Sequence, residues 1–200
     1  MTWIKVCGLF RETDIDYVNE AKPDYIGFIL NFPKSRRNLA ADQAALLKSR
    51  LSSDIKAVGV FVDQPAEDVV RAVEVIGLDV IQLHGCEDDA YIAALRDVTE
   101  LPIWKAFKIR TADDLAAAER SAADEILLDN GYGTGEVFNW SIVGRFRRPF
   151  LLAGGLTPEN IPQAIRSLHP KMVDISSGVE TDGRKDRNKI LAAVWAARES

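Results

Sequence analysis

Short apolar runs rich in β-branched residues recur along the chain, and segments with helical periodicity separate them. The apolar runs predict β-strands over 3–7, 25–30, 56–62, 79–83, 102–108, 125–129, 149–153 and 172–176. The segments between them predict helices over 12–21, 40–51, 65–77, 87–97, 111–121, 140–145, 158–168 and 186–198. Strands that alternate with helices in this way indicate βαβ units and a parallel sheet.

The number of these units decides the fold class. About eight strand–helix units in a chain of 200 residues predict an α/β fold, a single-domain (β/α)8 TIM barrel over residues 1–200. A doubly wound open sheet is the alternative, but it would usually have about six strands and a glycine-rich turn after the first. Here Gly8 is alone in that turn, whereas glycine-rich turns follow the last two strands, which favours the barrel. The polar stretch 181–186 predicts a surface loop before the last helix.

Composition narrows the possible partners. The formal net charge is −5, which argues against nucleic acid or an anionic membrane as a partner. No stretch approaches the ~20 apolar residues that cross a bilayer, and the first residues do not form a secretory signal. We therefore expect a small-molecule ligand, and the sequence leaves a monomer and a homodimer equally open.

Cysteine and histidine usage bears on the compartment and on metals. Cys7 and Cys86 lack paired-cysteine spacing, which fits a reducing compartment and predicts a cytoplasmic protein. His84 and His169 are isolated, so neither a metal nor another cofactor is expected.

Polar and glycine residues concentrate where the predicted strands end, which is where barrels of this class carry their active sites. The residues at these strand ends are Cys7, the loop Pro33-Lys34-Ser35-Arg36-Arg37, Gln82-Leu83-His84-Gly85, Asp129, Gly154-Gly155 and Ser176-Ser177-Gly178. A barrel with a purely structural role would not need this arrangement.

Cys7 shares a strand face with Lys5, because side chains two residues apart point the same way. A lysine inside a barrel needs a partner, and Asp174 or Asp129 could serve. We expect Lys5 to lower the pKa of the Cys7 thiol from its usual value of about 8.5. A lysine held only for structure is the alternative.

Two glycine-containing loops predict a phosphate site. Gly154 and Gly155 follow the seventh predicted strand, and Ser177 and Gly178 follow the eighth. Loops at these two positions frequently bind phosphate in barrels, helped by a short extra helix. Either pair alone would be explained by tight turns, but the two pairs together favour phosphate.

Three further parts of the chain have both a functional and a purely structural interpretation. A guanidinium of Arg36 or Arg37 can grip a substrate carboxylate, although a solvated basic turn is the rival. His84 can contact substrate or sit at the barrel rim. A carboxyl group at Asp129, in a partly desolvated mouth, can act as an acid with a raised pKa, or cap a loop.

Taken together and in this order, these motifs resemble the phosphoribosylanthranilate isomerase family, (β/α)8 enzymes of tryptophan biosynthesis. The resemblance spans nearly the whole chain. The matching segments are Lys5-Val6-Cys7-Gly8-Leu9, Gly27-Phe28-Ile29, Pro33-Lys34-Ser35-Arg36-Arg37, Val58-Gly59-Val60-Phe61-Val62, Gln82-Leu83-His84-Gly85, Leu127-Leu128-Asp129, Gly133-Thr134-Gly135, Leu152-Ala153-Gly154-Gly155-Leu156 with Pro158-Glu159-Asn160, and Val173-Asp174-Ile175-Ser176-Ser177-Gly178-Val179-Glu180.

The resemblance implies an Amadori rearrangement of a phosphorylated aminosugar, N-(5-phosphoribosyl)anthranilate, without a cofactor. It implies that Cys7 is the general base, that Asp129 is the general acid and that Arg37 contacts the anthranilate carboxylate. His84 and Asp174 are expected among the substrate-binding residues. The phosphate loops of the family fall on Gly154, Gly155, Ser177 and Gly178.

The chain departs from the family pattern in the loop Asn130–Gly135, at Asn139 and at Phe10. Three other functions compete with the family assignment. A related isomerase of histidine biosynthesis would have an aspartate in place of Cys7, and an indole-glycerol-phosphate synthase would need a lysine acid, for which Lys105 is the candidate. A non-catalytic phospholigand-binding barrel is compatible with the fold, but it would not need both Cys7 and Asp129.

Overall fold

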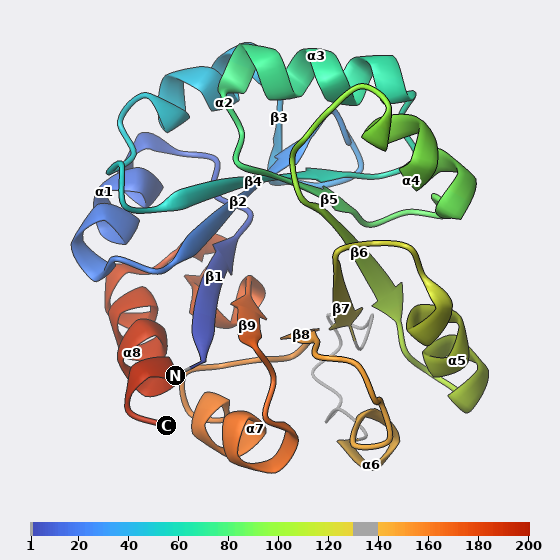
Figure 1. The fold of residues 1–200 in the computed structure, drawn as a ribbon. Helices are drawn as coiled ribbons and strands as arrows, with labels where there is room; N and C mark the ends of the chain where they lie inside the picture. The colour runs from blue at the N-terminus through green and yellow to red at the C-terminus, as the bar shows by residue number, and fades with distance from the viewer. Residues whose placement is uncertain (1, 130–139) are drawn as a thin grey trace.

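The computed structural model describes residues 2–129 and 140–200, so the departures at 130–135 and at Asn139 lie outside the described residues. In these ranges, eight parallel strands close a barrel in the order β1, β2, β4, β5, β6, β7, β8 and β9, and β9 pairs back with β1 (Figure 1). The barrel strands are β1 (Trp3–Cys7), β2 (Tyr25–Leu30), β4 (Lys56–Phe61), β5 (Val80–Leu83), β6 (Ile103–Lys108), β7 (Glu125–Asp129), β8 (Leu151–Ala153) and β9 (Met172–Ile175). The predicted barrel is confirmed, and the open sheet is excluded.

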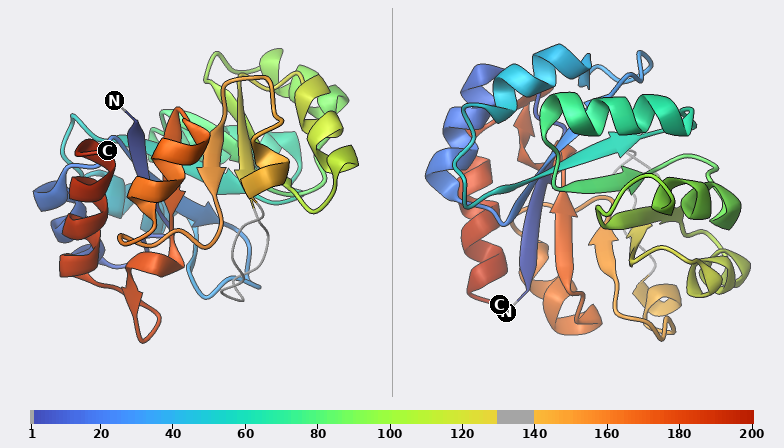
Figure 2. Two further views of the ribbon diagram at one scale, coloured as in Figure 1. Left: turned by 90° about the horizontal axis from the view of Figure 1, so that it is seen from below. Right: turned by 45° about the horizontal axis from the view of Figure 1, so that its top comes forward.

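Helices cover the outside of the barrel, and the end of α8 lies beside the start of β1 (Figures 1 and 2). The helices are α1 (Glu12–Ala21), α2 (Ala41–Lys48), α3 (Ala66–Ile76), α4 (Asp89–Arg96), α5 (Ala112–Arg120), α6 (Trp140–Val143), α7 (Ile161–Leu168) and α8 (Arg187–Arg198). Helix α7 begins three residues later than predicted, because the segment before it forms a turn in which the Asn160 side chain accepts the Thr157 N–H at 2.8 Å. No helix within the described ranges is long and apolar enough to cross a membrane.

Four short elements at the carboxyl end of the barrel were not among the predicted strands and helices. They are the two-residue strand β3 (Asn38–Leu39), the 3-10 helix η1 (Ser177–Val179), and the strands β10 (Glu180–Thr181) and β11 (Arg184–Lys185), which pair in an antiparallel hairpin. The stretch 181–186 lies largely at the surface before the last helix, as predicted, but it is not an irregular loop, because part of it forms this hairpin and Lys185 is buried. Asp182 and Gly183 both have positive φ angles, 51° and 76°, which close a two-residue turn between the short strands.

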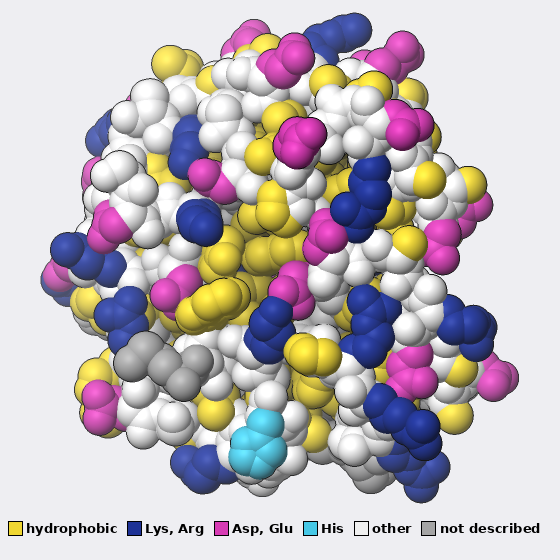
Figure 3. All heavy atoms as spheres, in the orientation of Figure 1, with side chains coloured by type: hydrophobic (Ala, Val, Ile, Leu, Met, Phe, Trp, Pro, Cys, Tyr) yellow, Lys and Arg dark blue, Asp and Glu magenta, His cyan; other side chains and the backbone are white. Residues whose placement is uncertain are grey.

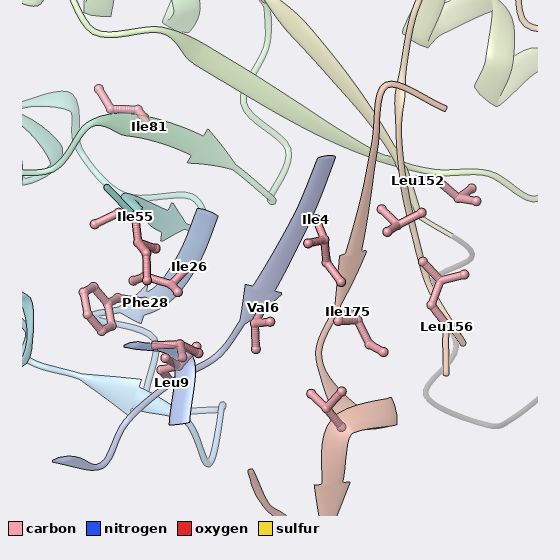
Figure 4. Packing of buried hydrophobic residues seen from close by; sticks show 14 of the residues in the cluster. Ile4, Val6, Leu9, Ile26, Phe28, Ile55, Ile81, Leu152, Leu156 and Ile175 are labelled. Atoms are coloured by element: carbon pink, nitrogen blue, oxygen red, sulfur yellow. The ribbon is translucent and has the colours of Figure 1, made fainter. Parts of the chain in front are cut away.

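Alternation along the strands separates two apolar layers. Ile4 and Val6 on β1 point outward and join the core shared with the helices, part of which Figure 4 shows. Lys5 and Cys7 point inward, above an inner cluster made of Tyr25, Val58, Val80, Trp104, Ala106, Leu127, Leu151, Ala153 and Met172. Parallel pairing sets Lys5 directly opposite Asp174 on β9, and Cys7 directly opposite Gly27 on β2.

The two ends of the barrel differ in chemistry. Figure 3 looks onto the amino-terminal end, where hydrophobic side chains gather at the centre of the face between charged ones. A cavity of about 570 Å³ lies there, and Trp3, Tyr25 and Trp104 line it in a chain of ring contacts. The predicted chemical residues instead lie at the opposite, carboxyl end.

Candidate active site

A smaller cavity of about 280 Å³ opens at the carboxyl end of the barrel. Its lining residues are Cys7, Ile29, Arg37, Val60, Gln82, His84, Asp129, Ala153, Gly154, Gly155, Leu156, Asp174, Ser176 and Ser177. Eight of the nine predicted site residues therefore meet around one space, although they come from segments spread over most of the sequence. Gly178 is the exception, because it does not line the cavity, although it lies against Leu156, which does.

Cys7 ends β1 and is 8% exposed. Its neighbour across the sheet is Gly27, and a Cβ at that position would lie 2.7 Å from Cys7 Sγ. The missing side chain of Gly27 thus leaves the room that the thiol occupies. The Ser176 hydroxyl donates to the Cys7 carbonyl oxygen at 3.0 Å, which fixes the end of the strand from the other side.

Lys5 lies one layer below Cys7 and donates to Asp174 Oδ2 at 2.7 Å. The side chains are 0% and 7% exposed, so this is a buried ion pair of the kind that alternation predicted. The second oxygen, Asp174 Oδ1, has no hydrogen-bond partner in the described part of the chain, and Asp174 lines the cavity. An unpaired buried acceptor beside a cavity is suited to accept a hydrogen bond from a ligand.

The pKa of the Cys7 thiol lies above its ordinary value, although Lys5 lowers it as expected. Burial raises the pKa of the thiol above its ordinary value, and the nearby Asp174 carboxylate adds to this. The positive charges of Lys5 and Lys185 act in the expected direction and lower the pKa, but they do not outweigh burial. Burial also disfavours the charged ammonium of Lys5, yet Asp174 and Cys7 together raise the pKa of Lys5. Lys5 therefore stays charged while the thiol holds its proton.

Replacing Lys5 with methionine is expected to raise the pKa of Cys7 further, because the cation that lowers it most is lost while Asp174 remains. The measurement is a pH titration of thiolate absorbance near 240 nm in the folded protein. A Cys7→Ala protein supplies the baseline contributed by the exposed Cys86. An unchanged or lower pKa would show that Lys5 does not stabilise the thiolate.

Asp129 ends β7, and the Nε2 atom of His84 lies 3.1 Å from its Oδ2. Gln82, two residues before His84 on the same face, places its amide nitrogen 3.4 Å from His84 Nδ1. When that amide donates to Nδ1, the histidine proton sits on Nε2 and the ring donates to the carboxyl group. His84 is therefore placed to orient Asp129, a role that its position in the sequence did not indicate.

The loops after β8 and β9 form the third part of the site. Gly154 and Gly155 have φ angles of 91° and 65°, a conformation that side chains disfavour. A Cβ at Gly178 would lie 1.9 Å from the carbonyl oxygen of Leu156, so the two loops touch where Gly178 has no side chain. The amides of Gly155 and Ser177 donate no hydrogen bond to any residue that the structure describes. This edge of the cavity can thus present N–H groups to an anion.

Arg37 makes a contact that the sequence analysis did not predict. Its Nε and Nη2 atoms donate to the two carboxylate oxygens of Glu180 at 2.6 Å and 2.8 Å. Glu180 also accepts from Arg36 at 2.5 Å and from the buried Lys185 at 2.9 Å. Burial opposes the charge on Glu180, but Arg37 and Lys185 hold its pKa at about 2. The sequence pattern assigns no role to Glu180, the last residue of a matching segment, and places Lys185 in a surface loop.

Lys105, the candidate for a lysine acid, does not reach the cavity. Its ammonium donates to the Gly85 carbonyl at 2.7 Å and to Glu87 at 2.9 Å. The Glu87 carboxylate also accepts the N–H groups of Asp63 and Gly85, both at 2.8 Å. Lys105 therefore serves to fix the loop after β5, which argues against the synthase alternative.

Comparison with known proteins agrees with this geometry. The family model described as N-(5'phosphoribosyl)anthranilate (PRA) isomerase matches residues 4–196. The N-(5'-phosphoribosyl)anthranilate isomerase of Clostridium kluyveri is 44% identical over 201 residues, covering 99% of this chain and 98% of the relative. The relative of the same name from Thermoanaerobacter sp. (strain X514) is 42% identical over 205 residues, covering 99% of this chain and 98% of its own length.

Solved structures give the same result. The crystal structure of phosphoribosyl anthranilate isomerase from Thermotoga maritima has a TM-score of 0.91 and 31% sequence identity, with all of both chains covered. A second structure, of the isomerase in complex with reduced 1-(o-carboxyphenylamino)-1-deoxyribulose 5-phosphate, has a TM-score of 0.88 and 30% identity, again over both whole chains.

Proposed function

The chain belongs to the N-(5'-phosphoribosyl)anthranilate isomerase family, and we propose that Cys7 is its general base and Asp129 its general acid. The reaction is the Amadori rearrangement of N-(5-phosphoribosyl)anthranilate to 1-(2-carboxyphenylamino)-1-deoxyribulose 5-phosphate, a step of tryptophan biosynthesis. One observation carries the assignment of roles. Cys7 on β1 and Asp129 on β7 line the same cavity from separate parts of the barrel wall.

Asp129 acts first in this scheme. Its carboxyl group gives a proton to the furanose ring oxygen of the substrate, the bond between that oxygen and C1′ breaks, and the nitrogen lone pair forms a protonated Schiff base with C1′. His84, which lies 3.1 Å from Asp129, orients the carboxyl group toward the ring. A carboxyl group that loses its proton at this step must start protonated.

Cys7 acts second. Its thiolate removes the proton from C2′, and the electrons of that C–H bond move to form the C1′–C2′ double bond of an enolamine, which tautomerises to the ketone. Burial raises the pKa of Cys7, which makes the thiolate a stronger base but a scarcer one at neutral pH. The neighbouring charges of Lys5 and Lys185 favour the thiolate form that this step requires.

The remaining lining residues hold the substrate. Arg37 at one edge of the cavity pairs with the anthranilate carboxylate, because a guanidinium matches a carboxylate with two parallel hydrogen bonds. Gly154, Gly155 and Ser177 bind the phosphate at another edge, and Gly178 lets their two loops meet. The free oxygen of Asp174 accepts a hydrogen bond from a sugar hydroxyl between these two ends.

The role of Arg37 is tested by comparing Arg37→Ala with Arg36→Ala in a turnover assay. We expect Arg37→Ala to raise KM by about tenfold or more, with a smaller change in kcat. A rise of this size corresponds to the loss of the binding free energy of one hydrogen-bonded charge pair. Arg36 is the matched control because it is an adjacent arginine that pairs with the same Glu180, yet its side chain is 58% exposed and outside the cavity lining. A larger rise in KM for Arg36→Ala would move the carboxylate contact to that residue.

We also propose that residues 1–200 act as one domain in the cytoplasm, where a reducing environment keeps the Cys7 thiol available as a base. The state of association is proposed to be a monomer or a homodimer. The relative from Thermotoga maritima is described as dimeric, with monomers generated from it, which supports both possibilities. Sedimentation equilibrium distinguishes them.

A further inference from the structure

The hairpin β10–β11 folds over the loop that carries Arg37 and brings Glu180 against it. Glu180 follows directly on the 3-10 helix after β9, so the barrel wall and the hairpin fix its backbone on both sides. Its side chain is 4% exposed, and it faces three cations, Arg36, Arg37 and Lys185. Glu180 is therefore the buried centre of a charge cluster and not an exposed surface carboxylate.

The contact between Glu180 and Arg37 uses one particular edge of the guanidinium. The Glu180 carboxylate accepts hydrogen bonds from Nε and Nη2, which form the edge of the guanidinium nearest the side-chain stem. The outer edge, formed by Nη1 and the second hydrogen of Nη2, has no acceptor among the described residues. Since Arg37 lines the cavity, this outer edge provides a second fork of the shape that a carboxylate accepts.

The stem of Arg37 is fixed as well. It crosses Gly8, where a Cβ would lie 2.5 Å from Arg37 Cδ and 3.3 Å from Ser176 Oγ. Gly8 follows Cys7 directly, so the arginine passes beside the proposed base. Lys185 extends the contact, since it donates to Glu180 at 2.9 Å and to the Ser176 carbonyl at 2.9 Å. The hairpin thereby ties Arg37 to the strand ends that carry Cys7 and Ser176.

We propose that Glu180 is a positioning residue that holds Arg37 with its outer edge toward the cavity, and so sets the preference of the site for a substrate bearing an aromatic carboxylate. The inference rests on the proposed role of Arg37. An arginine side chain has several freely rotating bonds, and fixing them in advance removes an ordering cost that binding would otherwise carry. Glu180 would improve carboxylate recognition in this way without touching the substrate.

Two ligands that differ only in the carboxylate test this role. Reductive amination of ribose 5-phosphate with anthranilate gives a stable 1-(2-carboxyphenylamino)-1-deoxyribitol 5-phosphate, and the same reaction with aniline gives its analogue without the carboxylate. Calorimetry measures the ratio of the two Kd values for each protein. This ratio cancels any general loss of folded protein or of phosphate binding, which a merely structural role of Glu180 would cause.

We expect the wild-type protein to prefer the carboxylated ligand by about 10-fold to 100-fold, and Glu180→Gln to lose most of that preference. In turnover, Glu180→Gln is expected to raise KM for the natural substrate with kcat changed by less than about threefold. Glu20→Gln is the matched control, because Glu20 pairs with Arg187 at an exposed position on α1. It should leave both the ratio and KM unchanged.

The Arg37→Ala variant distinguishes a failure of this inference from a failure of the proposed role of Arg37 in binding the carboxylate. If Arg37→Ala abolishes the preference and Glu180→Gln keeps it, Glu180 does not position Arg37. If Arg37→Ala keeps the preference, the proposed role of Arg37 is wrong, and the inference about Glu180 is then wrong as well. Should Glu180→Gln not fold, Glu180→Asp retains the charge that the three cations require but is too short to reach both Arg37 nitrogens. A full preference in Glu180→Asp would also overturn the inference.

Discussion

Replacing Cys7 with alanine is expected to lower kcat by about 10²–10⁴-fold, the range that a positioned general base contributes. The substitution removes the atom that takes the C2′ proton, and the neighbouring Lys5 cannot replace it, because its ammonium is held by Asp174 at 2.7 Å. The measurement follows the fluorescence of substrate generated in situ from anthranilate and phosphoribosyl pyrophosphate. A purified wild-type protein is expected to deplete this substrate rapidly.

The matched control for this experiment is Cys86→Ala, which removes the exposed cysteine and should leave turnover unchanged. The Cys7→Ala protein should still fold, because alanine is smaller than cysteine and Gly27 opposite it has no side chain to rearrange. Circular dichroism and binding of the stable reduced ligand would verify this. Turnover near that of the wild type in a folded Cys7→Ala protein would remove the thiol from the mechanism.

Replacing Asp129 with asparagine is expected to lower kcat by a similar factor, about 10²–10⁴-fold, because the amide has the shape of the carboxyl group but no acidic proton to give to the ring oxygen. Ring opening would then become rate-limiting. The assay is the same, extended over pH. The loss is expected at every pH, because the asparagine amide has no acidic proton to give in any part of the range.

Asp97→Asn is a suitable control, since Asp97 is an exposed aspartate at the end of α4, away from the cavity. It should keep the wild-type rate over the same pH range. An Asp129→Asn protein that is folded and turns over at a rate near that of the wild type would assign the acid to another group.

Alternation along single strands explains why part of the site was predictable. The pairing of Lys5 with a carboxylate inside the barrel follows from the two-residue period of a strand and from the cost of burying an unpaired charge. The sequence left Asp174 and Asp129 open as the partner. The register between the first and last strands, which the closed structure shows, selects Asp174.

Two features of the site could not be predicted from the sequence, for physical reasons. The contact between Arg37 and Glu180 joins residues 143 apart in sequence through a hairpin with two-residue strands, too short for any periodicity to show. The net direction of the Cys7 pKa depends on burial competing with charge, and the degree of burial is a property of the packed molecule. The sign of each charge could be predicted from the sequence, but not the outcome of that competition.

The pairing of Lys5 with Asp174 also constrains how the chain can be made. A ribosome delivers β1 first and β9 almost last, so for most of synthesis the lysine has no counter-ion. If β1 entered the barrel wall before β9 emerged, it would bury an unpaired ammonium at a cost of several kcal/mol. Lys5 therefore gains its counter-ion, and the Cys7 thiol its complete surroundings, only when β9 closes the barrel beside β1.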